Sequence, residues 1–292
     1  MDKMKAIIFG ANGQDGYYLN NLLQQKGINV IRVSRRGESL KIDISNYAEA
    51  SSLIKKEQPN YIFHLAANST TRHDALFENH QTISTGTLNI LEAVKQFSPH
   101  TKVFISGSGL QFLNIGNPIK ETDPFAANDA YSISRIQSVY AARYFRSIGI
   151  NVYVGYFFNH DSPLRSEVHV TKMISETVKR IAVGSSENLI IGDMKVIKEW
   201  SYAGDVVEGI WLLINQHEIF EANISSGQGY SIKEWIQECF KIVNLNFEMY
   251  TIVAKNFKSN YSSLVSNNNL IKSLGYNPKV SFSILAKMMM QK

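Results

Sequence analysis

The chain has 292 residues, of which 44% are hydrophobic and 19% charged, as in soluble globular proteins with a large core. Its net charge is +5 and its basic residues are scattered, which argues against a nucleic-acid-binding face and suits small anionic ligands such as nucleotides. No run of about 18 apolar residues predicts a membrane span, and a single cysteine, Cys239, without an N-terminal signal pattern indicates a cytoplasmic protein without internal disulfides.

The first half of the chain alternates short apolar runs with amphipathic stretches. Strands are expected at residues 5–9, 29–33, 61–65, 102–106 and 151–156. Helices are expected between them at residues 17–25, 48–56, 82–96 and 129–147, with a short strand at 40–42. This alternation predicts an α/β fold of the Rossmann type, a doubly wound parallel sheet covered by helices on both faces.

After Phe158 the pattern becomes irregular. Helices are expected at residues 168–183, 205–215, 231–243, 268–274 and 282–290, with a strand at 189–191. We interpret this strand and the helix at 205–215 as returning to the main sheet. The expected dinucleotide-binding domain is therefore residues 1–160 plus about 187–215. The remaining residues, about 161–186 plus 216–292, would form a smaller C-terminal substrate-binding lobe.

A glycine-rich turn, Gly10-Ala-Asn-Gly-Gln-Asp-Gly16, joins the first strand to the first helix. Its first glycine permits a tight turn, its second lets the backbone approach a pyrophosphate, and its third lets helix and strand pack closely. The helix N-terminus would face the anion. An ordinary tight turn is the alternative. Through this motif we assign the following residues to a dinucleotide cofactor: Gly10, Asn12, Gly13, Gln14, Asp15 and Gly16.

The end of the second strand is where a dinucleotide fold discriminates its cofactor. An acidic residue there would bind the ribose hydroxyls of NAD, whereas this chain has Ser34 followed by Arg35 and Arg36. Two guanidinium groups favour the extra phosphate of NADP, although a solvated basic loop is the alternative. Asp43 and Ile44 could contact the adenine, but Asp43 could equally cap the next helix.

Further motifs resemble the extended short-chain dehydrogenase/reductases, and within them the GDP-mannose 4,6-dehydratase and GDP-4-keto-6-deoxy-mannose reductase group. The resemblance covers nearly the whole chain. It includes the glycine turn with Gln14-Asp15, the third-strand motif His64-Leu-Ala-Ala67 and the segment Phe157-Phe-Asn-His-Asp-Ser-Pro-Leu-Arg165. It also includes Glu199-Trp200 with Asp205-Val-Val-Glu208, and the ending Leu274-Gly-Tyr-Asn-Pro278.

This resemblance implies NADP or NAD as cofactor and a nucleotide sugar, most often GDP-linked, as substrate. It places Leu65, Ala66, Ala67, His160 and Arg165 at the cofactor. Four residues would bind the substrate: Asn159, Thr171, Lys172 and Lys198, although the two lysines could simply be solvated. It also implies a homodimer joined through the helices at 82–96 and 129–147, whose apolar positions are equally compatible with core packing. No residue is assigned to a metal, to nucleic acid or to a membrane.

The catalytic residues implied by the resemblance are Ser108, Tyr131 and Arg135. Tyr131 and Arg135 are four residues apart on one helix face, so they can act on one bound molecule. The family has Lys where this chain has Arg135, which keeps the charge that stabilises the phenolate but has a longer, forked side chain. Tyr131 could also be a buried core aromatic, and Ser108 could be a loop-packing residue.

Leu110 replaces the Glu that removes a proton from carbon 5 in the dehydratases, and an alkyl side chain cannot act as an acid or base. The first hypothesis is therefore an NAD(P)-dependent enzyme acting at carbon 4 of a GDP-sugar, such as a 4-keto-6-deoxy-hexose reductase. The second is a catalytically weakened sugar-nucleotide-binding homologue, which Ile83 and Ser262 also favour because relatives have polar or basic residues there. The third is a GDP-sugar 4,6-dehydratase or epimerase that uses a different base.

Overall fold

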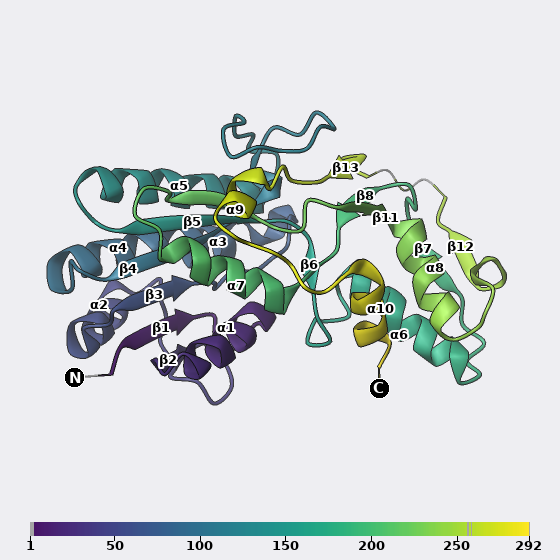
Figure 1. Ribbon diagram of the computed structural model, residues 1–292, viewed down its shortest axis with the longest axis horizontal. Helices are drawn as coiled ribbons and strands as arrows, with labels where there is room; N and C mark the ends of the chain where they lie inside the picture. The colour runs from purple at the N-terminus through teal and green to yellow at the C-terminus, as the bar shows by residue number, and fades with distance from the viewer. Residues whose placement is uncertain (1–2, 256, 258, 292) are drawn as a thin grey trace.

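The computed structural model describes residues 3–255, 257 and 259–291. Met1 and Asp2, at the N-terminus where the sequence predicts no signal peptide, therefore lie outside the described chain. Within these residues a central sheet of six parallel strands has the order β10-β5-β4-β3-β1-β2 (Figure 1). The strands are β1 (Lys5–Phe9), β2 (Asn29–Val33), β3 (Tyr61–His64), β4 (Lys102–Ser108), β5 (Val152–Phe157) and β10 (Glu221–Ile224). Chain order reverses between β1 and β3, where doubly wound folds place a ligand crevice. The predicted Rossmann-type fold is confirmed.

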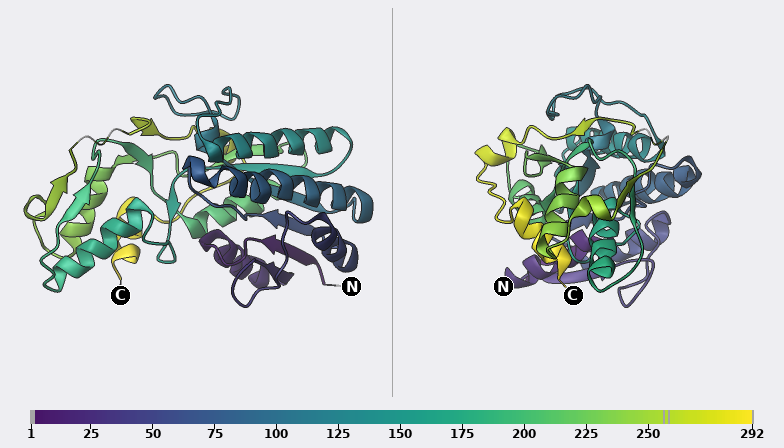
Figure 2. Two further views of the ribbon diagram at one scale, coloured as in Figure 1. Left: turned by 180° about the vertical axis from the view of Figure 1, so that it is seen from behind. Right: turned by 90° about the vertical axis from the view of Figure 1, so that its right-hand side faces the viewer.

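Helices cover both faces of this sheet because the side chains of each strand alternate between its faces. Ile7 and Phe9 pack with α2, α4 and α5, whereas Ala6 and Ile8 pack with α1 and α7 on the opposite face (Figure 2). These helices are α1 (Gln14–Gln25), α2 (Tyr47–Glu57), α4 (Gly86–Phe97), α5 (Ala130–Ser147) and α7 (Ala203–Ile214). Before α4 the chain forms the short helix α3 (Leu76–Asn79) and a π-helical segment, His80–Thr85, in which Ile83 is fully buried.

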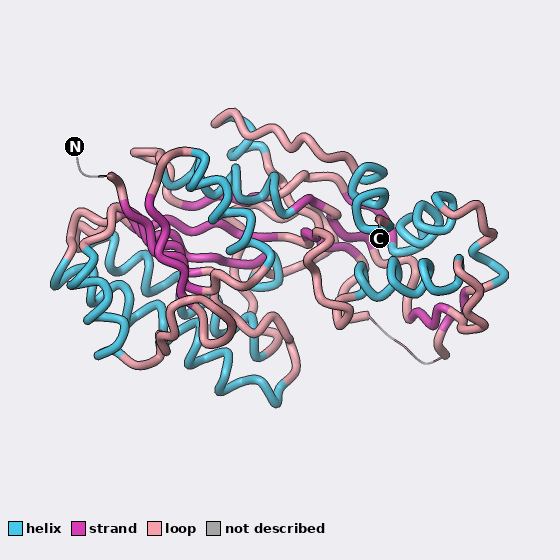
Figure 3. Tube along the Cα trace, turned by 90° about the horizontal axis from the view of Figure 1, so that it is seen from below, coloured by secondary structure: helices cyan, strands magenta, loops and turns pink. Residues whose placement is uncertain are grey.

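The smaller lobe lies beyond the carboxyl ends of the main strands (Figure 3). Trp200 and Trp235 stack at its centre, with ring centroids 4.8 Å apart. Its helices are α6 (Val170–Ala182), α8 (Ile232–Ile242) and α10 (Phe282–Met290). Its short strands are β7 (Leu189–Ile191), β8 (Ile197–Glu199), β11 (Gly229–Ser231), β12 (Thr251–Val253) and β13 (Ser263–Leu264). Two more strands, β6 (His160–Asp161) and β9 (Ser201–Tyr202), pair where the chain passes between the two parts.

Three expectations about these segments were wrong. β7 pairs with β12 inside the lobe instead of returning to the main sheet. β10 lies within the range assigned to the lobe, yet it pairs with β5 and forms an edge of the main sheet, and α9 (Asn269–Ser273) packs on it through Ile271. Leu40 makes only an isolated bridge with Val33, so residues 40–42 are not a strand. Hydrophobic patterning identifies a buried segment but not the element against which it is buried.

Most of the apolar residues considered for a dimer seam are part of the subunit core. The following five are buried inside the chain: Ile83, Leu91, Val139, Ala142 and Phe145. Leu88 is exposed, and so are Tyr140 and Tyr144 of α5. Among the described residues, no helix combines the length and the apolar character needed to cross a membrane.

Candidate active site

The glycine turn after β1 brings backbone rather than side chains to the crevice. Gly10 has a φ of +90°, and a Cβ atom there would lie 2.6 Å from the amide nitrogen of Ala66. A Cβ atom on Gly16 would lie 2.5 Å from the carbonyl oxygen of Gly10, so helix α1 can only approach β1 closely at a glycine. Gly13 caps α1 without a side-chain hydrogen bond, which leaves the first helical amides facing outward as an anion site.

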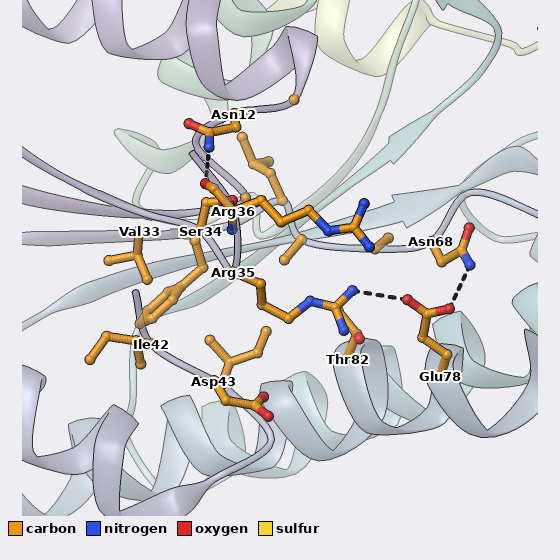
Figure 4. A pocket seen from close by; sticks show the side chains of 17 residues that line it. Asn12, Val33, Ser34, Arg35, Arg36, Ile42, Asp43, Asn68, Glu78 and Thr82 are labelled. Carbon is orange, nitrogen blue, oxygen red and sulfur yellow. Dashed lines mark hydrogen bonds and ion pairs between the residues drawn. The ribbon is translucent and has the colours of Figure 1, made fainter. Parts of the chain in front are cut away.

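A cavity of about 500 Å³ opens at the carboxyl ends of β1, β2 and β3, in the size range of cofactor pockets (Figure 4). The residues predicted to bind the cofactor that line it are Gly10, Asn12, Gly13, Arg35, Arg36, Asp43, Ile44, Leu65, Ala66 and Ala67. They come from separate stretches of sequence, and the fold brings them to one place. Asp43 does not cap α2: its carboxylate accepts hydrogen bonds from Ser45, and Asn46 is the capping residue.

The two arginines after β2 differ in their partners. Arg35 forms an ion pair with Glu78 of α3, with Nη2 and Oε1 2.9 Å apart. Asn68 donates a hydrogen bond to the second carboxylate oxygen, and both Asn68 and Glu78 line the cavity. The hydrogen bonds from Arg35 and Asn68 hold the pKa of Glu78 below its ordinary value. No motif in the sequence pointed to Glu78 or Asn68.

The side chains of Gln14 and Asp15 point away from this cavity. Gln14 donates to the carbonyl oxygen of His160 and accepts from Ser162. Oδ1 of Asp15 lies 2.9 Å from Nε2 of His160, whose other ring nitrogen contacts the carbonyl oxygen of Phe158. Contacts of Gln14 and Asp15 with a dinucleotide would therefore be made by their backbone amides, and His160 acts here as a partner of Asp15.

Burial and pairing oppose each other in the Asp15–His160 pair. Burial alone would raise the pKa of Asp15, but attraction to His160 and the hydrogen bond between them outweigh it, so the pKa lies below its usual value. Burial alone would lower the pKa of His160, but Asp15 outweighs it and the pKa is raised. The pair is therefore stabilised in its charged form and joins the start of α1 to β6.

Arg165, which was expected at the cofactor, and Thr171, which was expected at the substrate, both contact Asp161. Nε of Arg165 lies 3.2 Å from Oδ1 of Asp161. Thr171 is buried and donates to Oδ2 of the same carboxylate. Asn159 is partly buried, and among the described residues its Oδ1 has no hydrogen-bond partner. A buried acceptor without a donor fits a hydroxyl or amide of a ligand.

The two lysines expected at the substrate differ in their surroundings. Nζ of Lys172 lies 2.7 Å from Glu176, one helical turn later in α6, so its charge is already paired within the lobe. Nζ of Lys198 lies 5.6 Å from the ring centre of Tyr261. Tyr261 lines a second cavity, so Lys198 lies close to a residue of that cavity.

Ser108 ends β4, and Tyr131 and Arg135 lie in the first two turns of α5, which packs against β4. Oγ of Ser108 accepts a hydrogen bond from the amide of Leu110, which leaves its own proton to be donated. Asp129 caps α5 by accepting from the amides of Tyr131 and Ser132, which fixes the first turn of the helix. The guanidinium carbon of Arg135 lies 4.9 Å from the ring centre of Tyr131, as expected for residues four positions apart.

Arg135 is a buried cation at the centre of this site, with only 3% of its surface exposed. Its Nη1 donates to the carbonyl oxygen and to Oγ of Ser106, with the latter contact at 2.8 Å, and Oγ of Ser106 donates to the carbonyl oxygen of His64. Burial and the nearby Arg135 lower the pKa of His64 to about 3, so this histidine is neutral. Among the described residues the guanidinium of Arg135 donates to Ser106 and forms no ion pair with a carboxylate, and its Nε has no partner, which fits a ligand that brings acceptors.

A second cavity of about 610 Å³ lies beside the same junction. Gly109, Leu110 and Asp129, which adjoin Ser108 and Tyr131 in sequence, line it together with Asn260 and Tyr261 of the lobe. Its wall at Leu110 is an alkyl side chain, as expected from the sequence. Thr71, Asn114 and Asn128 also line this cavity, and sequence reasoning missed them because they lie in loops without a motif.

Comparisons with known proteins agree with this geometry. The family model for GDP-mannose 4,6 dehydratase matches residues 7–289. The chain belongs to the GDP-mannose 4,6-dehydratase family. GDP-mannose 4,6 dehydratase 1 of Arabidopsis thaliana is 28% identical over 97% of this chain and 88% of its own length. GDP-mannose 4,6-dehydratase of Vibrio cholerae is 29% identical, over 84% of this chain and 74% of its own length.

Solved structures of the same fold superpose on nearly the whole of this chain. RMD from Pseudomonas aeruginosa, complexed with NADPH, has a TM-score of 0.87 at 18% identity and covers 99% of this chain and 98% of its own. UDP-glucose 4-epimerase of Thermotoga maritima, with UDP-glucose, has a TM-score of 0.88 at 20% identity, covering 98% and 97%. The fold is that of the epimerase/dehydratase branch of the short-chain dehydrogenase/reductases, and the chain is an enzyme of this type.

Proposed function

We propose that this enzyme transfers a hydride between NADP or NAD and carbon 4 of a GDP-linked hexose. The observation that carries the proposal is the stacked pair of Tyr131 and Arg135 on α5, which packs against β4 where Ser108 ends the strand and next to the second cavity. Family membership supports the nucleotide sugar, because the relatives are named for GDP-mannose. The cofactor is supported by the glycine turn and the first cavity, and by neighbours of the same fold that bind NADPH or NAD.

Residues of the first cavity would hold the dinucleotide. The amides at the start of α1 and the bare backbone at Gly10 and Gly13 suit the pyrophosphate, and Arg36 suits a phosphate on the adenosine ribose. When bound, the nicotinamide supplies or accepts the hydride. The buried Arg135 would present its unpartnered Nε to hydroxyls of the adjoining ribose.

The side chains at the junction of β4 and α5 would handle the proton. Tyr131 gives a proton to the oxygen on carbon 4 during reduction of a ketone, and takes it back during oxidation of the alcohol. Ser108 donates a hydrogen bond to the same oxygen. Arg135, fixed on Ser106, holds a positive charge beside the ring of Tyr131.

Two overall reactions can follow from this step. Family membership supports 4,6-dehydration, in which carbon 4 is oxidised, a proton leaves carbon 5, water leaves carbon 6 and the hydride returns to carbon 6. Leu110 favours the second candidate, reduction of a 4-keto-6-deoxy sugar, because the cavity wall at that position has no group that could take the proton from carbon 5.

One experiment separates the two reactions. The enzyme is incubated with GDP-mannose and NADP, and separately with a GDP-4-keto-6-deoxy-hexose and NADPH. The masses of the products are measured by mass spectrometry. Dehydration yields a product lighter by one water with no net change in cofactor, whereas reduction consumes NADPH in step with the ketone. Tyr131→Phe should abolish either activity. Turnover of neither substrate, or full activity of Tyr131→Phe, would refute the proposal.

We also propose a homodimer through α4 and α5, supported by the exposed Leu88, Tyr140 and Tyr144 on these helices. Light scattering of the wild-type enzyme and of Tyr144→Glu should give a dimer and a monomer, respectively. An unchanged mass in the variant would exclude this face as the interface.

A further inference from the structure

The end of the first cavity next to β2 contains charges of both signs. Arg35, Arg36, Asp43 and Glu78 all line it. Glu78 comes from α3, 43 positions after Arg35 in the chain, and reaches across the cavity to it (Figure 4). The carboxylate is held from two sides, by Nη2 of Arg35 at 2.9 Å and by Nδ2 of Asn68 at 2.8 Å.

This arrangement separates the two arginines electrostatically. The charge of Arg35 is compensated by Glu78, and its guanidinium is drawn toward α3. The guanidinium of Arg36 also points into the cavity, and within the described part of the chain it forms no ion pair. The basic sequence Arg35-Arg36 therefore supplies to this cavity one cation, Arg36, that has no ion-pair partner among the described residues.

We propose that Glu78 determines cofactor selectivity by holding Arg35 away from the 2′-phosphate of NADP, so that the enzyme discriminates only weakly between NADP and NAD. The inference rests on the proposed function only in that a dinucleotide must bind in the first cavity. The 2′-phosphate carries a charge of about −1.5 to −2 near neutral pH, so it competes with the carboxylate for Arg35 and is repelled by it. The 2′-hydroxyl of NAD carries no charge and can donate to a carboxylate.

Removing the carboxylate of Glu78 should therefore affect the binding of NADP and of NAD differently. In Glu78→Gln the cavity loses one negative charge and Arg35 becomes available to the phosphate. The pair is about half exposed, with 55% and 45% of the two side chains accessible, so it contributes little to stability and the variant should fold.

The test measures dissociation constants of NADPH and NADH by ligand fluorescence in the wild type, Glu78→Gln, Arg35→Ala and the double variant. Glu78→Gln should tighten NADPH on the order of tenfold and change NADH less than about twofold, the size of one charge-assisted contact at a partly exposed site. Arg35→Ala should weaken NADPH less than about threefold in the wild type but about tenfold in Glu78→Gln, because the two residues are coupled. Glu92→Gln is the matched control, since its carboxylate pairs with Lys95 on α4 and does not line the cavity.

Two results would overturn the proposal. One is an equal change in NADPH and NADH affinity in Glu78→Gln, or no change in either. The other is an equal weakening of NADPH binding by Arg35→Ala in the wild type and in Glu78→Gln. Because the readout is binding, an enzyme that binds both cofactors but turns over no sugar nucleotide would refute the proposed reaction and leave this inference standing, whereas binding of neither cofactor would refute both.

Discussion

Replacing Ser106 with Ala tests whether the buried guanidinium of Arg135 is positioned by the end of β4. The hydroxyl of Ser106 accepts a hydrogen bond from Nη1 of Arg135 at 2.8 Å and donates one to the carbonyl oxygen of His64 at 3.0 Å. Ser106→Ala removes both bonds and leaves Arg135 with the backbone carbonyl of residue 106 as its remaining partner on β4. We expect the cation to lose its fixed position beside Tyr131.

The magnitude follows from the charge and the burial of the group. A hydrogen bond to a charged partner contributes about 1.5–3 kcal/mol, and the surviving bond to the carbonyl oxygen of Ser106 keeps part of it, so we expect a loss of stability of about 2 kcal/mol. For a chain of this length that corresponds to a fall of a few degrees in the melting temperature. A displacement of Arg135 by about 1 Å should lower kcat by roughly 10- to 100-fold.

The assay compares kcat and KM for hydride transfer in the wild type, Ser106→Ala and a control, Ser134→Ala. Ser134 is also buried, and its hydroxyl donates to the carbonyl oxygen of Ala130 one turn earlier in α5 and not to the guanidinium of Arg135. We expect a loss of stability of about 1 kcal/mol in Ser134→Ala, which removes one neutral hydrogen bond, and a fall in kcat only in Ser106→Ala, with KM for the sugar nucleotide little changed. Equal kcat values in the two variants would refute the reasoning.

Three further changes test other parts of the site. Leu110→Glu should create or raise dehydratase activity toward GDP-mannose while lowering ketone reduction severalfold, and mass spectrometry of products without any water loss would contradict the role given to this wall. Gly16→Ala should cost several kcal/mol and abolish dinucleotide binding, because its Cβ would lie 2.5 Å from a backbone oxygen; urea unfolding with an unchanged midpoint would be inconsistent with the packing. Because the pKa of His160 is raised in the folded state, its protonation stabilises the fold fully below the unfolded pKa of about 6.5, and this stabilisation is lost as the pH rises through the folded pKa. Because the pKa of Asp15 is lowered in the folded state, its ionisation stabilises the fold above the unfolded pKa of about 3.9, and this stabilisation is lost as the pH falls through the folded pKa. The stability difference between wild type and Asp15→Asn should therefore be largest between about pH 4 and 6.5, and a pH-independent difference in urea midpoints would exclude the charged pair.

Local sequence was sufficient for the parts of the site that depend on one turn of chain. The glycine turn was predictable because only glycine fits where Gly16 approaches the backbone of Gly10 and where Gly10 approaches the backbone of Ala66, just after β3. The stacking of Arg135 on Tyr131 was predictable because residues four apart share a helix face. Helix α10 was placed at its observed bounds, Phe282–Met290, for the same reason.

Contacts between distant segments were not predictable from these patterns. Glu78 has no motif, and its importance depends on α3 meeting the loop after β2 across the cavity. His160 was expected at the cofactor, yet the pairing of β6 with β9 and the side chain of Asp15 hold it in the protein. β10 was not expected as a strand because its four residues, Glu221–Ile224, include two polar side chains and so form no apolar run.

Arg135 shows how local sequence and tertiary contacts combine at one residue. The sequence indicated that the charge survives and that a longer, forked side chain must be accommodated. In the structure the extra length lets Nη1 reach Ser106, so one arm of the fork is used by the protein while Nε has no partner within the described chain. Because a buried cation without a carboxylate is costly, the site is more stable with a ligand that supplies acceptors. Arg135 is therefore expected to link cofactor binding to stability, and Arg135→Ala should reduce the rise in melting temperature that NADPH produces in the wild type.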